Sequence, residues 1–324
     1  MQNMLKYITK RLAQTVLVLF VVAMIVFILT NYIGDPVSAM LTEEATYETI
    51  QELREELGLN DPLPVQFFNF LKDAIRGDFG NSYIYKQPVL QLIAERMPAT
   101  LELVTITALL TLIIAIPLGV FAGAFPKSRI SKLIMTGSIL GISLPTFWIG
   151  MMLIYIFSVQ YGVLPASGRG DTVNVLGLEL SIFAEGGWRY LVMPSITLSL
   201  SYIATILRLT RTGIRENMKQ DYIKFARAKG VSSKNVLFHH ALKNALIPVV
   251  TVFGINIGKM FAFTTITETI FAWPGMGKLL IDAIYRSDRP IIVAYLMITS
   301  VMFVGINFVV DIIYTIIDPR IELR

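Results

Sequence analysis

Long apolar runs, separated by shorter polar segments, divide the chain into pieces that have the length of a membrane-spanning helix. The first run, residues 12–30, covers about 28 Å at about 1.5 Å per residue, which matches the hydrocarbon thickness of a bilayer. Further runs cover residues 99–124, 133–159, 191–209, 245–270 and 291–317. The pattern predicts an all-α integral membrane protein with about six transmembrane helices, the third of which is kinked at Pro145.

Basic residues indicate which ends of these runs face the cytosol. Lys6, Lys10 and Arg11 precede the first run, and no small-residue cleavage site follows it, so we interpret it as an uncleaved span and not as a signal peptide. Lysine and arginine also follow the second run and fill the segment between the fourth and fifth. The positive-inside rule then places both termini in the cytosol.

The segment 35–98, between the first two spans, is polar and acidic. Residues 49–58 and 64–75 repeat apolar positions at helical spacing, and Gly58 supplies a stop for the first of these helices. We expect a small extracytoplasmic helical cap. It either shields the helix ends or offers a docking face to a soluble partner, and the sequence leaves both interpretations open.

Composition agrees with a membrane protein. Hydrophobic residues make up 54 % of the chain, charged residues 16 %, and the mean hydropathy is +0.63, whereas soluble domains carry about 25 % charged residues. The net charge of +5 does not indicate nucleic-acid binding, because the basic residues fall in the cytosol-facing gaps. The absence of cysteine excludes disulfides, thiolate metal sites and a cysteine nucleophile.

A basic island between the fourth and fifth spans, residues 208–248, is the most distinctive polar stretch. Residues 221–230 predict a short helix that ends at Gly230, and a second helical run follows Ser232. Such an island is usually a solvated connector. Here Tyr222, Ile223, Phe225 and Val231 are apolar residues that we expect to be exposed, and exposed apolar residues on a cytosolic helix require a partner to cover them.

Several polar residues fall inside the predicted spans. Lys259 lies about 21 Å into the fifth span, where an ammonium facing lipid costs on the order of 3 kcal/mol, so we expect it to face protein or water. We interpret it as part of a translocation pathway for an anionic or zwitterionic solute; snorkelling or structural pairing are the alternatives. The other candidate pathway residues are Asn256, Thr264, Glu268 and Ser199. Gly254 and Gly258 have small-xxx-small spacing, which favours close helix packing.

Motifs for catalysis are absent from the sequence. It contains no zinc-protease, serine-hydrolase or P-loop pattern, so this chain has no nucleotide-binding loop with which to hydrolyse ATP. The only histidines, His239 and His240, are adjacent and point about 100° apart on a helix, which prevents a joint grip on a metal. We expect no catalytic residues, no metal site and no cofactor on this chain.

The motifs resemble those of one transporter family. The blocks DYIKFARAKG (221–230) and HALKNALIP (240–248) are similar to the cytosolic coupling loop of permease subunits of binding-protein-dependent ABC importers, in the dipeptide/oligopeptide/nickel subfamily. Further similar blocks are GDP (34–36), LGL (57–59), GDFG (77–80), PATLEL (98–103), TETIFAWPGMG (267–277), RSDRP (286–290) and the ending 311–320 with DPR at 318–320. One departure is that KFA (224–226) replaces the superfamily's Glu-Ala-Ala triplet.

The resemblance implies a set of partners. These are a second homologous permease subunit in a heterodimer, two ATP-binding subunits that carry the ATP and Mg, and an extracytoplasmic solute-binding protein, at the bacterial or archaeal cytoplasmic (inner) membrane. The ATPase-coupling residues would be Asp221, Tyr222, Phe225, Ala226, Arg227, Lys229 and Gly230. Pro145, Gly275 and Gly277 are candidates for a gate or hinge.

The apolar runs and the charge pattern divide the chain into four expected parts. They are residues 1–34 with the first transmembrane helix, the extracytoplasmic helical region 35–98, the permease core 99–317 with its coupling loop at 210–244, and a cytosolic tail at 318–324. The solute stays open among peptides, glutathione-like molecules, nickel and metal chelates. The rival interpretation is a stand-alone secondary transporter or channel that uses Lys259 and Glu268 as an ion relay, and a membrane-embedded enzyme is a third.

Overall fold

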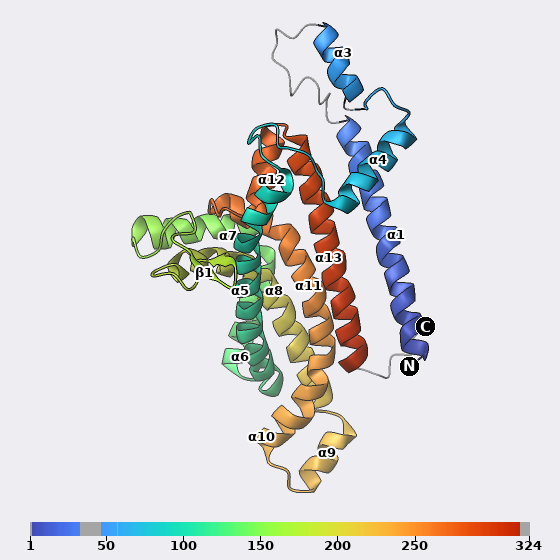
Figure 1. The fold of residues 1–324 in the computed structure, drawn as a ribbon. Coiled ribbons are helices and arrows are strands. Elements are labelled where there is room, and N and C mark those ends of the chain that lie inside the picture. The colour runs from blue at the N-terminus through green and yellow to red at the C-terminus, as the bar shows by residue number, and fades with distance from the viewer. Residues whose placement is uncertain (1, 33–46, 57, 318–324) are drawn as a thin grey trace. The chain divides into compact units, whose positions relative to one another are not determined.

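The computed structural model describes residues 2–32, 47–56 and 58–317. The 34–36 motif and the tail at 318–324, with the DPR motif at 318–320, lie outside the described residues. The described residues form two compact units, one of residues up to 98 together with 274–305, and one of residues 99–273 together with 306–317. Within these ranges most of the residues are helical (Figure 1).

The apolar runs form the long helices. Five helices of the described chain are long and apolar enough to cross a membrane. They are α1 (Gln2–Tyr32), α5 (Val89–Ala124), α8 (Trp188–Asn217), α11 (Leu242–Ile270) and α13 (Arg289–Ile317). A bent pair, residues 129–143 and 146–160, brings the number to six if it is one broken span. The prediction of about six transmembrane helices is therefore confirmed.

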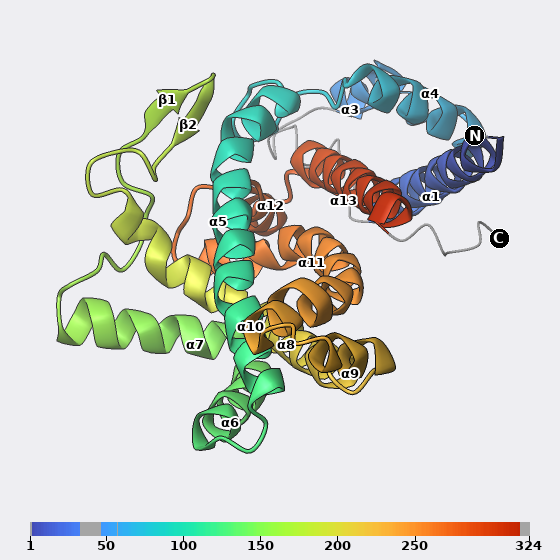
Figure 2. The ribbon, with the colours of Figure 1, turned by 90° about the horizontal axis from the view of Figure 1, so that it is seen from below.

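The third predicted span is broken, not merely kinked. Helix α6 (Arg129–Ser143) and α7 (Thr146–Leu153), which continues as a π-helical stretch (Ile154–Gln160), are bent by 106° (Figure 2). Pro145 lacks an N–H, and its ring also pushes Leu144 out of the helical region, to φ −85° and ψ 134°. Two consecutive residues are thus extended, which turns the expected kink into a corner.

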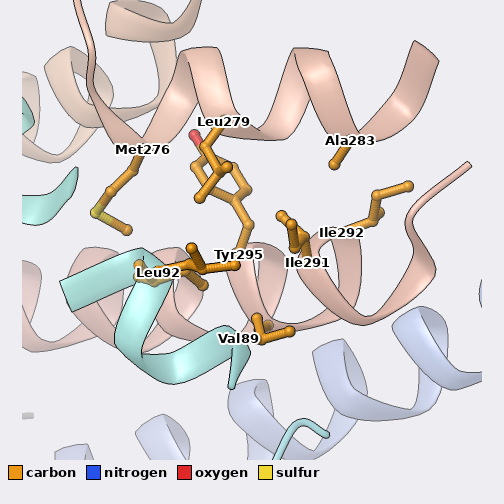
Figure 3. Packing of buried hydrophobic residues seen from close by; sticks show 10 residues of the cluster. Val89, Leu92, Met276, Leu279, Ala283, Ile291, Ile292 and Tyr295 are labelled. Atoms are coloured by element: carbon orange, nitrogen blue, oxygen red, sulfur yellow. The ribbon is translucent and has the colours of Figure 1, made fainter. Parts of the chain in front are cut away.

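The first unit contains the helices predicted for residues 49–58 and 64–75. Helix α3 (Tyr47–Glu56) ends just before Gly58, and α4 (Leu63–Arg76) ends at Gly77, which has φ 76°. The hydrophobic core of this first unit joins the start of α5 to α12 (Met276–Tyr285) and α13 (Figure 3). Fully or nearly fully buried members are Val89, Ile93, Met276, Ala283, Ile291 and Ala294.

A buried carboxylate fixes the loop before α5 in the same unit. Asp288, which is 1 % exposed, accepts hydrogen bonds from the Ser82 hydroxyl and from the backbone N–H groups of Tyr83 and Ile84. Each of these bonds to a charged acceptor is stronger than a neutral one. The turn that begins α13 is thereby tied to a segment about 205 positions earlier in the chain.

In the second unit α8 packs against both α6 and α11. Glycines allow the closest approaches: an added Cβ at Gly123 would lie 2.8 Å from the Cβ of Ile214, and one at Gly254 would lie within 2.3 Å of the Val310 side chain. Gly254 therefore serves helix packing against the end of α13, as the small-xxx-small interpretation predicts.

A two-stranded hairpin follows α7, and the all-helical expectation missed it. Strands β1 (Val173–Val175) and β2 (Leu178–Leu180) are antiparallel. Leu176 and Gly177 between them have φ 54° and 86°, as in the mirror-image turns that suit hairpins (Figure 2).

An almost completely buried ion pair anchors this hairpin segment. The Glu102 carboxylate on α5 accepts from Arg169 Nε at 3.0 Å and Nη2 at 2.6 Å, and from Ser181 Oγ and Ile182 N at 3.1 and 2.7 Å. Arg169 also donates to the Glu179 carbonyl and lies over the Trp273 ring. The pair thus connects α5, the hairpin segment and the residues that follow α11.

We expect the Glu102–Arg169 pair to behave as a unit in unfolding experiments. Arg169→Met should lower the free energy of unfolding by about 3–5 kcal/mol, because it leaves a buried carboxylate without its counter-ion. The double variant Glu102→Gln/Arg169→Met should recover most of that loss, as measured by thermal or denaturant unfolding in detergent micelles. Asp171→Asn, at an exposed carboxylate of the same loop, is the control. Equal losses in the single and double variants would contradict the expected coupling.

Candidate functional site

The basic island forms a compact helical element, seen in Figure 1 beyond the ends of α8 and α11. Helix α9 (Asp221–Ala228) begins after the extended Gln220, and α10 (Ser233–Asn235) begins at Ser232, whose hydroxyl accepts from Asn235 N. Gly230 has φ 80°, and the Val231 N–H donates a hydrogen bond to the Ala226 carbonyl at 3.1 Å. The helix, its glycine stop and the serine cap are as the sequence predicts.

The inner face of α9 is apolar and packs on its own unit. Ile223 is fully buried among Val120, Ile214, Val236, Ala241 and Ala245. The expectation that Ile223 is exposed was wrong, because the ends of α5, α8 and α11 supply the surface that covers it. Val231 is half-buried against the same cluster.

A hydrogen-bonded bridge fixes the position of α9. The Tyr222 hydroxyl donates to Asn217 Oδ1 at 2.7 Å and accepts from Asn244 Nδ2 at 3.0 Å. Asn217 belongs to the last turn of α8 and Asn244 to the first turn of α11. One side chain of α9 therefore connects the ends of two long helices, and displacement of α9 would pull on both.

The outer face of α9 is aromatic and basic. Phe225 is 61 % exposed, and the Lys229 ammonium lies 4.5 Å from the centre of its ring. Arg227, two positions from Phe225 in the sequence, is also exposed. Lys224 donates to Asp221 at 2.8 Å, and this hydrogen bond together with the lysine charge lowers the pKa of the Asp221 carboxyl. The outer face of α9 thus presents an exposed phenylalanine with a lysine ammonium over its ring.

The adjacent histidines lie in a π-helical stretch, Val236–Ala241. The rings of His239 and His240 meet edge to face, with centroids 5.4 Å apart. Among the described residues no group of three or more histidine, aspartate or glutamate side chains could hold a metal ion.

The candidate pathway residues fall into two groups. Lys259 is exposed on α11, on a face that also exposes Ile255 and Phe263. Asn256, Thr264, Glu268 and Ser199 are buried. Thr264 and Ser199 donate to carbonyls of their own helices, and the Asn256 amide nitrogen is buried with no hydrogen-bond partner in the described structure.

Glu268 and Lys259 lie on different faces of α11. The Glu268 carboxylate is completely buried and accepts from Thr100 Oγ1 at 2.7 Å. The structure therefore does not bring the two residues of the supposed ion relay together. The roles of the pathway residues stay predictions, and the exposed face around Lys259 is the part of α11 that a solute or a second subunit could reach.

The three hinge candidates occupy different settings. Pro145 lies at the corner between α6 and α7. Gly275 is the extended residue that precedes α12, and Gly277 is buried in the first turn of that helix.

Sequence reasoning missed the two buried carboxylate clusters at Glu102 and Asp288. Both residues lie in matched motif blocks, and Glu102 is a charged residue within an apolar run, which is a recognised signal of a functional or paired group. Their partners could not be predicted from the local sequence; Arg169, for example, lies 67 positions from Glu102.

The apolar spans and the basic, aromatic-tipped helix between two of them define a multi-pass membrane transport subunit. The chain belongs to the family described as binding-protein-dependent transport system inner membrane component, whose model matches residues 115–323. The companion model for the N-terminal part of such components matches residues 4–104. The chain is thus a membrane permease component of an ABC transport system, located in the inner membrane.

Curated relatives are similar over nearly their whole length. The "Probable peptide ABC transporter permease protein y4tP" of Sinorhizobium fredii is 40 % identical over 98 % of this chain and 99 % of its own. The "Oligopeptide transport system permease protein AppB" of Bacillus subtilis is 37 % identical over 98 % of this chain and 100 % of its own. The "Glutathione transport system permease protein GsiC" of Escherichia coli is 36 % identical over 99 % of this chain and 100 % of its own.

One solved structure shares the fold. An inward-facing form of the MetNI methionine ABC transporter matches with a TM-score of 0.55 and 15 % identity, over 71 % of this chain and 97 % of that chain. The helical architecture of this chain is therefore that of an ABC transporter membrane subunit.

Two variants distinguish the faces of α9. Ile223→Ala removes a fully buried side chain and should destabilise the element by about 2–5 kcal/mol, which makes the bonds after Lys224 and Arg227 easier for trypsin to cut. Phe225→Ala, at an exposed position, is the matched control and should leave the cleavage rate unchanged. Equal rates of tryptic cleavage in the two variants would mean that Ile223 does not hold α9 in place.

Proposed function

We propose that this chain is one permease subunit of an ATP-driven importer that moves peptides or a related small solute into the cytoplasm. The observation that carries the proposal is the similarity, over almost the full length, to relatives named for peptide, oligopeptide and glutathione transport. Glutathione is itself a tripeptide, so these names share one chemistry. Nickel and metal chelates are the less favoured solutes.

In this proposal α9 is the coupling helix. Its outer face, with Phe225, Arg227 and Lys229, docks on an ATP-binding subunit, while Ile223 and Tyr222 fasten it to the long helices. Support comes from the match of residues 221–230 to the family's coupling loop and from the exposed aromatic ring. ATP-driven movement of the ATPase would then displace the ends of α8 and α11 together.

The remaining partners follow from the same proposal. A second homologous permease completes the pathway in a heterodimer, two ATP-binding subunits hold ATP and Mg, and a solute-binding protein delivers the solute outside. The region 35–98 lies on the extracytoplasmic side, both termini are cytosolic, and 99–317 forms the permease core. The absence of a P-loop from this sequence supports separate ATPase chains.

Lys259 is proposed to line the pathway and to attract a carboxylate of the solute. Its exposed position on an apolar helix supports this role, since an ammonium that faced lipid there would cost on the order of 3 kcal/mol. The rival secondary transporter has less support, because Lys259 and Glu268 lie on different faces of α11 and the curated relatives are named as transport-system permeases.

The coupling proposal predicts that Phe225→Asp abolishes ATPase association and transport, because it places a charge in a docking surface. Gly230→Pro should act similarly, since proline cannot adopt φ 80°. The measurement is co-purification of P-loop ATPases with a tagged chain, followed by solute-stimulated ATP hydrolysis. Lys234→Gln, an exposed change in the same segment but outside α9, is the control. Survival of both association and transport in Phe225→Asp would refute the docking assignment.

The pathway proposal predicts that Lys259→Met lowers uptake of a dipeptide by about tenfold, the equivalent of one favourable charge contact of about 1.4 kcal/mol. Lys259→Arg keeps the charge and should retain most of the activity. Uptake is measured in proteoliposomes with the complete complex. An unchanged rate for Lys259→Met would leave snorkelling or structural pairing as the explanation of this residue.

A further inference from the structure

A cavity of about 460 Å³ opens in the unit that contains α1, α4 and the start of α13. Its apolar lining includes the rings of Phe27, Phe70 and Phe79. Its charged lining consists of the carboxylates of Asp73 and Asp78 and the guanidinium of Arg289. No candidate coupling or pathway residue lines the cavity, so it is distinct from the proposed coupling surface and from the proposed pathway.

The cavity lies at the level where two apolar spans end. Phe27 is close to the end of the apolar part of α1, residues 11–29, and Arg289 begins the apolar part of α13, residues 289–310. Phospholipid headgroups occupy this level of a bilayer. The cavity is therefore placed where a headgroup can enter it directly from the membrane.

Helix α4 provides a second, independent sign of lipid. It exposes Leu63, Phe68 and Ile75 at 63, 65 and 79 %, and none of its residues is fully buried. Phe67 holds it against α1 through edge-on contacts with Phe20 and Phe27, at ring centroid distances of 5.6 and 5.4 Å. An amphipathic helix with exposed apolar residues beside the end of a span is typical of a helix that lies in the membrane interface.

The charged groups of the cavity suit a zwitterion. Asp73 and Asp78 are exposed, and Asp78 uses Oδ1 to accept from the Gly80 N–H at 3.0 Å, so further lone pairs can accept from an ammonium. Arg289 is 8 % exposed, and its five N–H donors allow it to bind a phosphate in addition to its present contacts. Tyr83, another lining residue, supplies a phenol O–H as a further donor, and burial raises the pKa of this phenol.

We propose that this cavity binds the headgroup of an aminophospholipid, with its primary ammonium at Asp73 and Asp78 and its phosphate at Arg289. The acyl chains then run along the exposed apolar face of α1, which includes Met24 and Ile28. The lipid is a bound component of the transporter, so the proposal does not depend on the transported solute or on the coupling helix.

The proposed contacts discriminate between headgroups. Phosphatidylethanolamine supplies three N–H donors and one phosphate. Phosphatidylcholine lacks N–H donors, and phosphatidylglycerol has no cation to offset the two carboxylates. A free dipeptide also carries an ammonium and an anionic group, but it has no acyl chains to bury beside α1.

The test uses the full-length chain purified in its complex, depleted of lipid and titrated with each of the three phospholipids. Native mass spectrometry gives the bound fraction. Phosphatidylethanolamine should bind at least tenfold more tightly than phosphatidylglycerol. The double variant Asp73→Asn/Asp78→Asn should bind the two lipids with about equal affinity. Asparagine keeps the size of aspartate and the acceptor for the Gly80 N–H, so the variant should fold, which circular dichroism verifies. Asp171→Asn is the matched control and should retain the preference.

Three outcomes would overturn the proposal. Equal affinities for the three phospholipids would show that the headgroup is not recognised. An undiminished preference in Asp73→Asn/Asp78→Asn would place the recognition elsewhere. Displacement of bound phosphatidylethanolamine by an equimolar dipeptide would assign the cavity to a soluble zwitterion in place of a lipid.

Discussion

The Glu102–Arg169 ion pair is the interaction on which the irregular part of this helical protein depends. Buried polar groups have no water to satisfy them, so a non-helical segment that packs on a long helix needs hydrogen-bond partners within the protein. Glu102 provides them by accepting from Arg169, Ser181 and Ile182, and Arg169 in turn covers the Trp273 ring. The Trp273 indole donates back to the Ala99 carbonyl on α5. These contacts hold the non-helical segment 161–187 against one turn of a long helix.

The element around α9, proposed as the coupling helix, is fastened differently. It has no buried charges; an apolar inner face and one tyrosine hydroxyl fasten it to the ends of α8 and α11. Its outer face is left with an aromatic ring and cations. Different residues of this eight-residue helix therefore hold it in place and face outward. A partner docked on the outer face could exert force on α9 without displacing it from its own unit.

Local patterns in the sequence were sufficient for the spans, for α9 and for the glycine and serine residues that end or begin helices, because these features depend on neighbours within one or two turns. The buried position of Ile223 was missed, since apolar residues occur all round α9 and the pattern does not say which of them meet α5, α8 and α11. The sharpness of the bend at Pro145 was underestimated, since a kink was expected in place of a corner. The hairpin at 173–180 was not predicted. The partners of Glu102 and Asp288 depend on long-range contacts that no local pattern contains.

The contacts of α5 also have a consequence for the order of assembly. Its turn at residues 99–102 receives Arg169, Glu268 and Trp273, which lie 67, 168 and 174 positions later in the chain. During synthesis this helix enters the membrane before any of those residues has left the ribosome. Until residues 169–182 arrive, Glu102 has neither its counter-ion nor its backbone donor. The contacts of Thr100 and Ala99 wait longer, for Glu268 in α11 and for Trp273 just after it. This part of α5 therefore reaches its final environment in two stages, and a nascent chain that stops before Arg169 carries an uncompensated carboxylate.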